Sequence, residues 1–158
     1  MVGDSLLRGT EAPICHPDPL SREVCCLPGA CNKDMTERLP DLIHPTDYYP
    51  LLLFRLGTSD TTISKLKNIK KDYKELEAAL KNSEAQVVFS SVLQIRGMRR
   101  ERTDRIKKID KWLKEWCCEQ HFGYLIHGTN FEKYGLLGED GVHLSDKGKI
   151  VCGCKLYS

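Results

Sequence analysis

The sequence predicts an α/β fold built on a parallel β-sheet, and two features of the 158-residue chain carry this prediction. Continuous apolar runs occupy Tyr49–Leu56, Ala85–Leu93 and Phe122–His127, with a weaker run at Glu23–Leu27. Because these runs do not alternate polar with apolar residues, they suit strands that are buried on both faces of a parallel sheet. Segments of helical periodicity lie between them, and this alternation favours right-handed crossover connections.

Two segments carry apolar side chains at three- and four-residue steps, which places these side chains on one face of a helix. The first stripe consists of Ile63, Leu66, Ile69, Tyr73, Leu76 and Leu80. The second consists of Ile106, Ile109, Leu113 and Trp116 and ends at Gln120. A shorter helix is expected over Asn32–Ile43, interrupted by Pro40. Since no repeat or Gly/Ser linker divides the sequence, we expect a single domain over residues 1–158.

The composition is that of a globular protein with nearly balanced charge. Hydrophobic residues make up 41% of the chain and charged residues 29%, which argues against intrinsic disorder. The 24 Lys and Arg against 22 Asp and Glu leave a net charge of +2, which alone does not predict a nucleic-acid-binding protein. No apolar run approaches the roughly 18 residues of a membrane span, and no signal-peptide pattern follows Met1. We therefore expect a soluble, cytoplasmic protein.

The eight cysteines are expected to be thiols of the core or incidental thiols. A disulfide framework is typical of exported proteins, and the sequence shows no export signal. The pairs Cys25–Cys26, Cys117–Cys118 and Cys152/Cys154 are not CxxC motifs, and no HxxxH motif follows them. We therefore expect no zinc site.

The basic stretch Arg96–Lys108 has two interpretations. It can be a solvated loop that leads into a helix, with Glu101 and Asp104 offsetting part of its charge. It can also contact the phosphates of RNA or of an anionic membrane. The first is favoured because no aromatic residues, on which bases could stack, are interleaved with the arginines.

Ser5 is the candidate nucleophile, and it lies in Gly3-Asp4-Ser5-Leu6 where a strand should end. A serine hydroxyl needs a neighbouring base to take its proton. Asp140-Gly141-Val142-His143 supplies one, because the carboxylate can reach one ring nitrogen of His143 and leave the other facing Ser5. A helix should start after this motif, with Ser145 as its N-cap. Alone, each motif is short enough to arise by chance.

Two further small motifs follow predicted strands. Gly57-Thr58-Ser59-Asp60 comes after the most hydrophobic run, and Gly29 comes after the weaker one. Each by itself is typical of an ordinary turn at the end of a strand. Their order in the chain, between the Ser5 motif and the His143 motif, is what favours a catalytic interpretation.

In this order the four motifs resemble the SGNH (GDSL-type) hydrolase superfamily: GDS, then a glycine, then GxND, then DxxH. More closely, the sequence resembles the esterase domain in the first open-reading-frame protein of chicken-repeat-type vertebrate LINE retrotransposons. The segments GDSLLRGTE, REVCCLPGA, PTDYYPLLLF and FGYLIHGTNFEKYGLLGEDGVHLSDKGK carry this likeness. The resemblance implies a flavodoxin-like three-layer sandwich with strand order 2-1-3-4-5, hydrolysis of acyl or lipid-like esters, and no metal or organic cofactor.

The resemblance also implies roles for single residues. Ser5 corresponds to the nucleophile and an oxyanion donor, Gly29 to a backbone oxyanion donor, and Asp140 and His143 to the acid and base of the triad. Ser59 stands where the family has its oxyanion Asn. Losing one such donor typically lowers the rate about 100- to 1,000-fold, so we expect weakened activity.

A second departure concerns the first strand. Only Met1 and Val2 precede Gly3, whereas a strand of roughly five residues is usual. We therefore expect an N-terminally truncated domain with most of its central strand missing. The alternative to an esterase is a catalytically decayed, retroelement-derived domain that acts as an RNA-binding, membrane-binding or self-association module.

Overall fold

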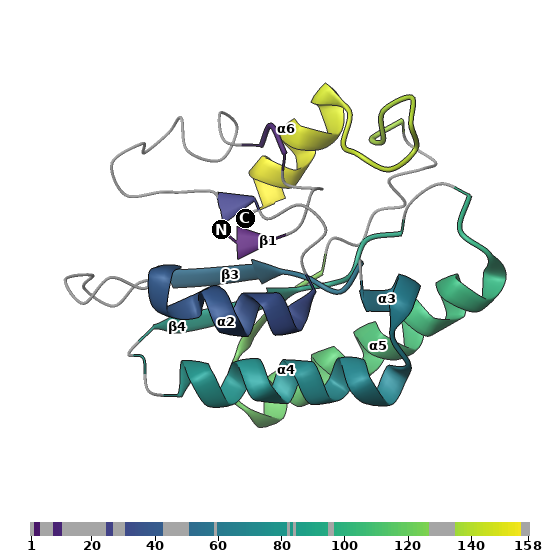
Figure 1. Cartoon of the computed structure of the whole chain (residues 1–158). Helices are drawn as coiled ribbons and strands as arrows, with labels where there is room; N and C mark the ends of the chain where they lie inside the picture. The colour runs from purple at the N-terminus through teal and green to yellow at the C-terminus, as the bar shows by residue number, and fades with distance from the viewer. Residues whose placement is uncertain are drawn as a thin grey trace.

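The computed structural model describes residues 2–3, 8–10, 25–26, 31–42, 51–58, 60–81, 83, 85–94, 97–126 and 135–155. Strands and helices alternate along these segments (Figure 1). The strands are β1 (Val2–Gly3), β2 (Cys25–Cys26), β3 (Leu51–Arg55), β4 (Gln86–Ser90) and β5 (Gly123–Leu125). The helices are α2 (Asn32–Leu42), α3 (Asp60–Ile63), α4 (Leu66–Leu80), α5 (Arg100–Glu119) and α6 (Asp146–Lys155).

The described strands form one parallel sheet in the order β2-β1-β3-β4-β5, which confirms the order implied by the resemblance. The short strand β1 is central, because Val2 pairs with Cys25 on one side and with Phe54 on the other. Since the strands are parallel, their carboxyl ends share one edge of the sheet. Open α/β sheets place their ligand sites at this edge.

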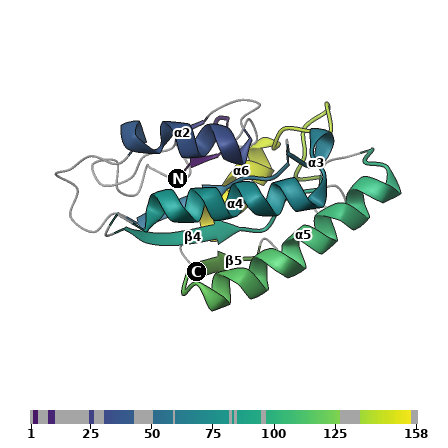
Figure 2. The ribbon, with the colours of Figure 1, turned by 60° about the horizontal axis from the view of Figure 1, so that its bottom comes forward.

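Helices cover both faces of the sheet and make the predicted three layers. Figures 1 and 2 show α2, α4 and α5 on one face and α6 on the other. Helix α2 packs on α4, and α5 packs against α3 and β5. Within the described part of the chain, no helix combines the length and the apolar character needed to cross a membrane.

The core lies between the sheet and helices α4 and α5, and aromatic rings dominate it. Phe89 of β4 stacks on Phe54 of β3 with ring centroids 5.5 Å apart. Tyr73 of α4 and Trp116 of α5 approach the same ring at 5.7 and 5.5 Å. Each such pair adds about 0.5–1.5 kcal/mol beyond simple burial. These four rings are buried. Tyr73 and Trp116 belong to the two predicted stripes, whose other members from Ile69 to Leu80 and from Ile106 to Leu113 are also buried, which confirms that the stripes face the core.

Two helix boundaries differ from the expectation. Ile63 belongs to the separate short helix α3, so the first stripe is continuous only from Leu66 onwards. Pro40 lies inside α2, which continues to Leu42. A proline in the last turn of a helix removes one hydrogen bond but leaves the preceding turns intact, so the helix tolerates it.

Candidate active site

The loop that carries Asp140 and His143 is a tight turn closed by backbone hydrogen bonds. Leu137 and Leu144 form an antiparallel bridge on either side of it. The Gly138 N–H donates to the His143 carbonyl at 2.8 Å, and the Gly141 N–H donates to the Gly138 carbonyl at 3.0 Å. Gly141 has φ +69°, in the left-handed region that glycine adopts most readily.

Within this turn the carboxylate of Asp140 lies against the ring of His143. Its Oδ2 is 2.6 Å from Nδ1 of His143. Its Oδ1 accepts the backbone N–H groups of Val142 and His143 at 2.9 and 3.0 Å. The bond to the ring, followed by these two backbone bonds, lowers the pKa of Asp140 to about 2. The carboxylate is therefore charged at neutral pH, and Nε2 is the ring nitrogen that it does not engage.

Helix α6 anchors this loop. Ser145 caps the helix as predicted, because its Oγ accepts the Gly148 N–H at 3.1 Å. The same hydroxyl donates to the Gly135 carbonyl at 3.0 Å, and the Ser145 N–H donates to the Leu136 carbonyl at 2.9 Å. The two ends of the His143 loop are thus joined at the start of α6.

The segment that follows Ser5 returns to this helix. A Cβ atom at Gly9 would stand 3.1 Å from Nζ of Lys149, so Gly9 lies directly against α6. Gly3, at the end of β1, marks the other side of the Ser5 motif. The chain on either side of Ser5 is therefore fixed at the central strand and at the helix that carries the His143 loop.

The turn after β3 is also closely packed. Gly57 has φ +103°, and a Cβ atom there would stand 2.8 Å from Val92, too close for any side chain. The Thr61 N–H donates to the Gly57 carbonyl at 3.0 Å. The Thr61 hydroxyl donates to the Thr58 carbonyl at 2.8 Å. The described residues around Ser59 are thus held in one conformation.

Two arginines of the basic stretch stabilise this turn, a role that the sequence did not predict. Nη2 of Arg102 donates to the Thr58 carbonyl at 2.8 Å. Nη1 of Arg105 donates to the carbonyls of Thr61 and Ser64 at 3.0 and 3.3 Å. The basic stretch does lead from a loop into a helix as expected, but the helix begins already at Arg100, so residues 100–108 lie inside α5. A sequence shows that an arginine is present but not which carbonyls it meets.

The predicted site residues divide into two groups. Asp140 and His143 are described, and they are brought together. Ser5, Gly29 and Ser59 lie outside the described residues. The strands that precede these three, β1, β2 and β3, are neighbours in the sheet, so the three motifs leave the sheet at adjacent points of one edge.

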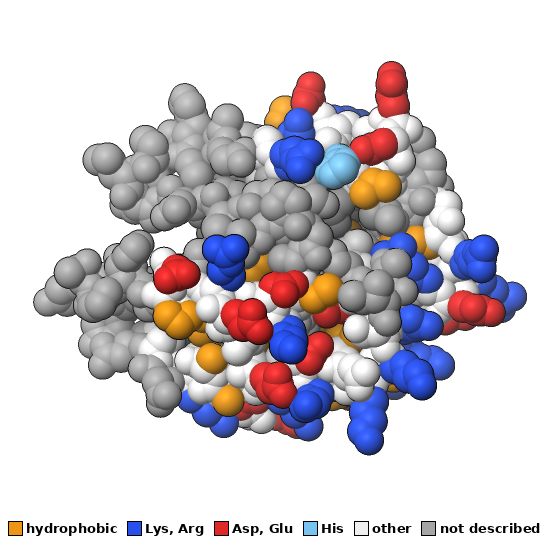
Figure 3. Space-filling view, in the orientation of Figure 1, with side chains coloured by type: hydrophobic (Ala, Val, Ile, Leu, Met, Phe, Trp, Pro, Cys, Tyr) orange, Lys and Arg blue, Asp and Glu red, His pale blue; other side chains and the backbone are white. Residues whose placement is uncertain are grey.

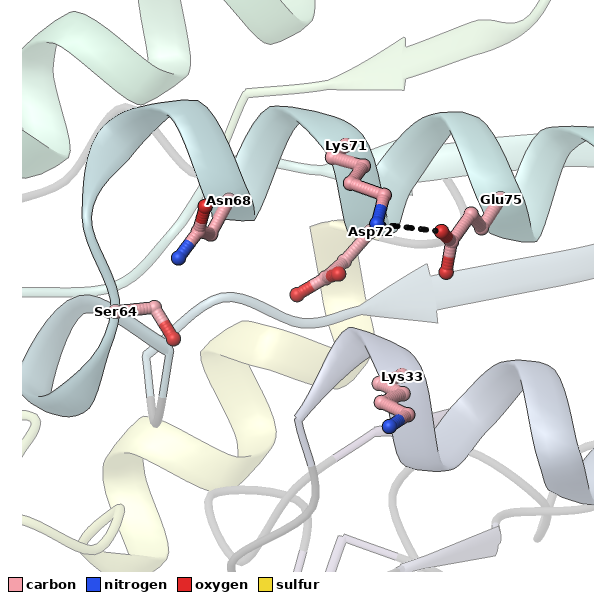
Figure 4. Close-up of a pocket in the computed structure, with 6 residues that line it drawn as sticks. All are labelled: Lys33, Ser64, Asn68, Lys71, Asp72 and Glu75. Carbon is pink, nitrogen blue, oxygen red and sulfur yellow. Dashed lines mark ion pairs between the residues drawn. The ribbon is translucent and has the colours of Figure 1, made fainter.

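A hollow of about 490 Å³ lies elsewhere, between α2 and α4. Figure 4 shows Lys33 on α2 and Asn68 and Asp72 on α4 around it. Its remaining lining residues are Ser64, Lys71 and Glu75, and the last two form an ion pair of 3.4 Å. Neither Asp140 nor His143 lines this hollow, so we do not assign it to the candidate active site. Among the described residues, no three His, Cys, Asp or Glu side chains are arranged to hold a metal ion.

Solved structures share this fold, whereas no family model and no curated protein matches the sequence. A GDSL-like lipase from Bacteroides thetaiotaomicron superposes with a TM-score of 0.79 at 16% identity, over 99% of this chain and 83% of the lipase. A member of the lipolytic G-D-S-L family from Veillonella parvula gives 0.78 at 17% identity, over 99% and 93%.

A third match concerns the more specific resemblance. The esterase domain of the ORF1 protein of the zebrafish ZfL2-1 retrotransposon is 26% identical, with a TM-score of 0.54 over 99% of this chain and 94% of that domain. Together with the strand order, these matches confirm the resemblance seen in the sequence: the chain has the fold of the GDSL-type (SGNH) hydrolases and is similar to a retrotransposon esterase domain.

Proposed function

We propose that the protein hydrolyses carboxylic esters through an acyl-enzyme formed on Ser5. The observation that carries the proposal is the contact of 2.6 Å between Asp140 and Nδ1 of His143, in a chain with the fold of GDSL-type hydrolases. A carboxylate on Nδ1 fixes the neutral tautomer that accepts a proton at Nε2. It also stabilises the imidazolium that forms when this proton is taken up.

The reaction has two steps. Ser5 Oγ attacks the acyl carbon while its proton passes to His143 Nε2, and the carbonyl oxygen becomes an oxyanion. The alcohol leaves with the proton from His143, and the acyl group remains on Ser5. Water then attacks this ester with His143 again as base, which releases the acid and restores the serine. The N–H groups of Ser5 and Gly29 are the proposed oxyanion donors, with a weak contribution from Ser59.

The similar structures support a proposal for the substrate class. They include a GDSL-like lipase and an acetyl xylan esterase. We therefore propose an acyl ester of small or lipid-like type as the substrate. The likeness to the zebrafish domain supports an origin in a retrotransposon protein.

The alternative role, contact with RNA or an anionic membrane through Arg96–Lys108, has less support. Figure 3 shows Lys and Arg side chains gathered over α3 and the start of α5. Arg102 and Arg105 nevertheless bind carbonyls of the protein itself. The exposed members Arg99, Arg100, Lys107 and Lys108 remain for such a contact, and no described contact favours it or self-association over hydrolysis.

The test is labelling by a fluorophosphonate, which reacts with an activated serine. The folded protein should be labelled and should hydrolyse p-nitrophenyl acetate, and Ser5→Ala should abolish both. His143→Ala should leave a serine that reacts at least about 100-fold more slowly, because the base is lost. Labelling that survives in Ser5→Ala, or its absence from the folded wild-type protein, would refute the proposal.

A further inference from the structure

The carboxylate of Asp60 links two segments that lead to the candidate oxyanion groups. Asp60 is the first residue of α3, directly after Ser59, and its side chain is fully buried. The backbone N–H of Asn32 donates to it, with nitrogen–oxygen distances of 3.3 and 3.4 Å to the two carboxylate oxygens. Asn32 is the first residue of α2, shortly after Gly29. One side chain thus joins the chain that follows β2 to the chain that follows β3.

This link is enclosed by protein. Burial, followed by the charge of Asp60, raises the pKa of the Cys31 thiol to about 11, so the thiol and the carboxylate are neighbours. On the side of α4, Tyr73 is fully buried, and its hydroxyl donates to the Leu56 carbonyl at 3.4 Å. The same hydroxyl would stand 3.1 Å from a Cβ atom at Gly57. The contact between Asp60 and Asn32 is therefore shielded from the competing hydrogen bonds of water.

The backbone of Asn32, not its side chain, makes this contact. The side-chain amide is buried near the Tyr73 hydroxyl, and among the described residues it makes no hydrogen bond of ordinary geometry. Replacing this side chain therefore removes no described hydrogen bond. Removing the N–H, by contrast, would leave the buried carboxylate with one fewer donor, which is the more damaging change.

We propose that Asp60 is a positioning residue, whose ionised carboxylate sets the spacing between the start of α2, which follows Gly29 in the chain, and the start of α3, which follows Ser59. The inference rests on the proposed esterase function, because both segments are proposed to face the developing oxyanion. An oxyanion hole is effective when its donors are fixed before the charge develops. A charged acceptor holds a backbone N–H more strongly than a neutral one, so ionisation of Asp60 tightens the link.

The groups around Asp60 determine the pH at which its carboxylate ionises and its hydrogen bond with the Asn32 N–H becomes stronger. Burial raises the pKa of Asp60 to about 6; the Asn32 N–H lowers it and the nearby charge of Asp72 raises it. The titratable and charged groups that neighbour Asp60 or the turn at α3 are Cys31 before α2, Asp72 and Tyr73 on α4, and Arg102 and Arg105 on α5, which bind Thr58, Thr61 and Ser64. Asp60 is therefore charged at about pH 8 and mostly neutral at about pH 5.

The sharpest test compares two substitutions at one position. Asn32→Pro deletes the N–H at the first position of α2, where helices tolerate proline well, while Asn32→Ala keeps the N–H. With p-nitrophenyl acetate, kcat of Asn32→Pro should be about tenfold lower than that of Asn32→Ala, with KM values within about twofold of each other. Equal kcat values in the two folded variants would overturn the proposal.

The pH profile supplies a readout that a merely structural role would not move. In the wild type, the fall of kcat toward acid pH should include a step from the protonation of Asp60. Asp60→Asn should start from a lower plateau and should lack this step. Asp72→Asn is the matched control: it should keep the plateau and move the Asp60 step to lower pH, because a nearby like charge is gone. If Asp60→Asn keeps both the plateau kcat of the wild type and its fall toward acid pH, the proposal is wrong.

The link can also be observed without turnover, from the backbone amide resonance of Asn32 in NMR spectra of the full chain. This resonance should titrate with a midpoint near pH 6 in the wild type and should not titrate in Asp60→Asn. If turnover does not depend on Ser5, the proposed function is wrong, but the titration of the Asn32 amide resonance still shows whether Asp60 accepts its N–H. An Asn32 resonance that is insensitive to pH overturns the link even in an active enzyme.

Discussion

Gly148 in α6 offers a test of how the His143 loop is anchored. A Cβ atom at this position would overlap the carbonyl oxygen of Leu136 and stand 2.9 Å from its carbon, closer than ordinary contacts. Both atoms belong to the backbone, so no side-chain rotation relieves the overlap, and α6 must move away from Leu136. The helix propensity gained by alanine, about 1 kcal/mol, offsets only part of an overpacking penalty of about 1–3 kcal/mol or more.

We expect Gly148→Ala to lower the free energy of unfolding by about 2 kcal/mol in urea denaturation. It should also lower kcat at least about tenfold, because the bond from Ser145 to Leu136 that sets the loop is strained. Gly138→Ala is the matched control, since its Cβ would lie 3.6 Å from the His143 carbonyl oxygen, an ordinary contact. If Gly148→Ala matches Gly138→Ala in both stability and kcat, α6 does not hold the loop as argued.

Three further changes should have measurable effects. Ser59→Asn should raise kcat on a short aryl ester about tenfold or more, with little change in KM, because the amide contacts charge that exists only in the transition state. An unchanged kcat would show that Ser59 does not stand at the oxyanion position. Since burial raises the pKa of Asp110 to about 6, as it does for Asp60, the wild-type free energy of unfolding should fall as pH rises from about 4 to about 6, and Asp110→Asn should make this fall smaller in urea titrations. Adding about five apolar, β-branched residues before Val2 should raise the melting temperature by about 10 °C, because β1 pairs with the last two residues of β3 and leaves Leu51–Leu53 without a partner in the described part of β1. Equal melting of both chains would refute this register.

The sequence was a good guide to the elements because periodicity reports burial directly. The stripes on α4 and α5 and the runs of β3 and β4 follow the same pattern that the core requires. Boundaries were less predictable, since the ends of an element depend on contacts from elsewhere in the chain. The separate helix α3 is an example: its turn is held by Arg105 of α5, distant in sequence.

The candidate site shows the same division. The contact of Asp140 with His143 could be predicted because both residues lie in one short turn, where spacing alone brings them together. The link from Asp60 to Asn32 could not, because these residues are 28 positions apart and meet only through the order of β1, β2 and β3. In the sequence Asp60 is only the last residue of the Gly57-Thr58-Ser59-Asp60 motif, and its spacing does not indicate a contact with Asn32.

Asp60, which is buried, and Asp110, which is half-buried, lie near the carboxyl edge of the sheet, and both oppose folding when charged at neutral pH. Burial raises the pKa of each to about 6, so keeping either one charged above that pH opposes folding. For Asp60 the shift from 3.8 to about 6 corresponds to about 3 kcal/mol. When charged, each carboxylate is a strong acceptor for a backbone N–H. The Asn32 N–H donates to Asp60, and the Val92 N–H donates to Asp110 at 2.8 Å. Asp60→Asn should therefore be at least as stable as the wild type at about pH 8 and yet have a lower kcat. If the only role of Asp60 were to support the fold, the substitution would instead lower stability.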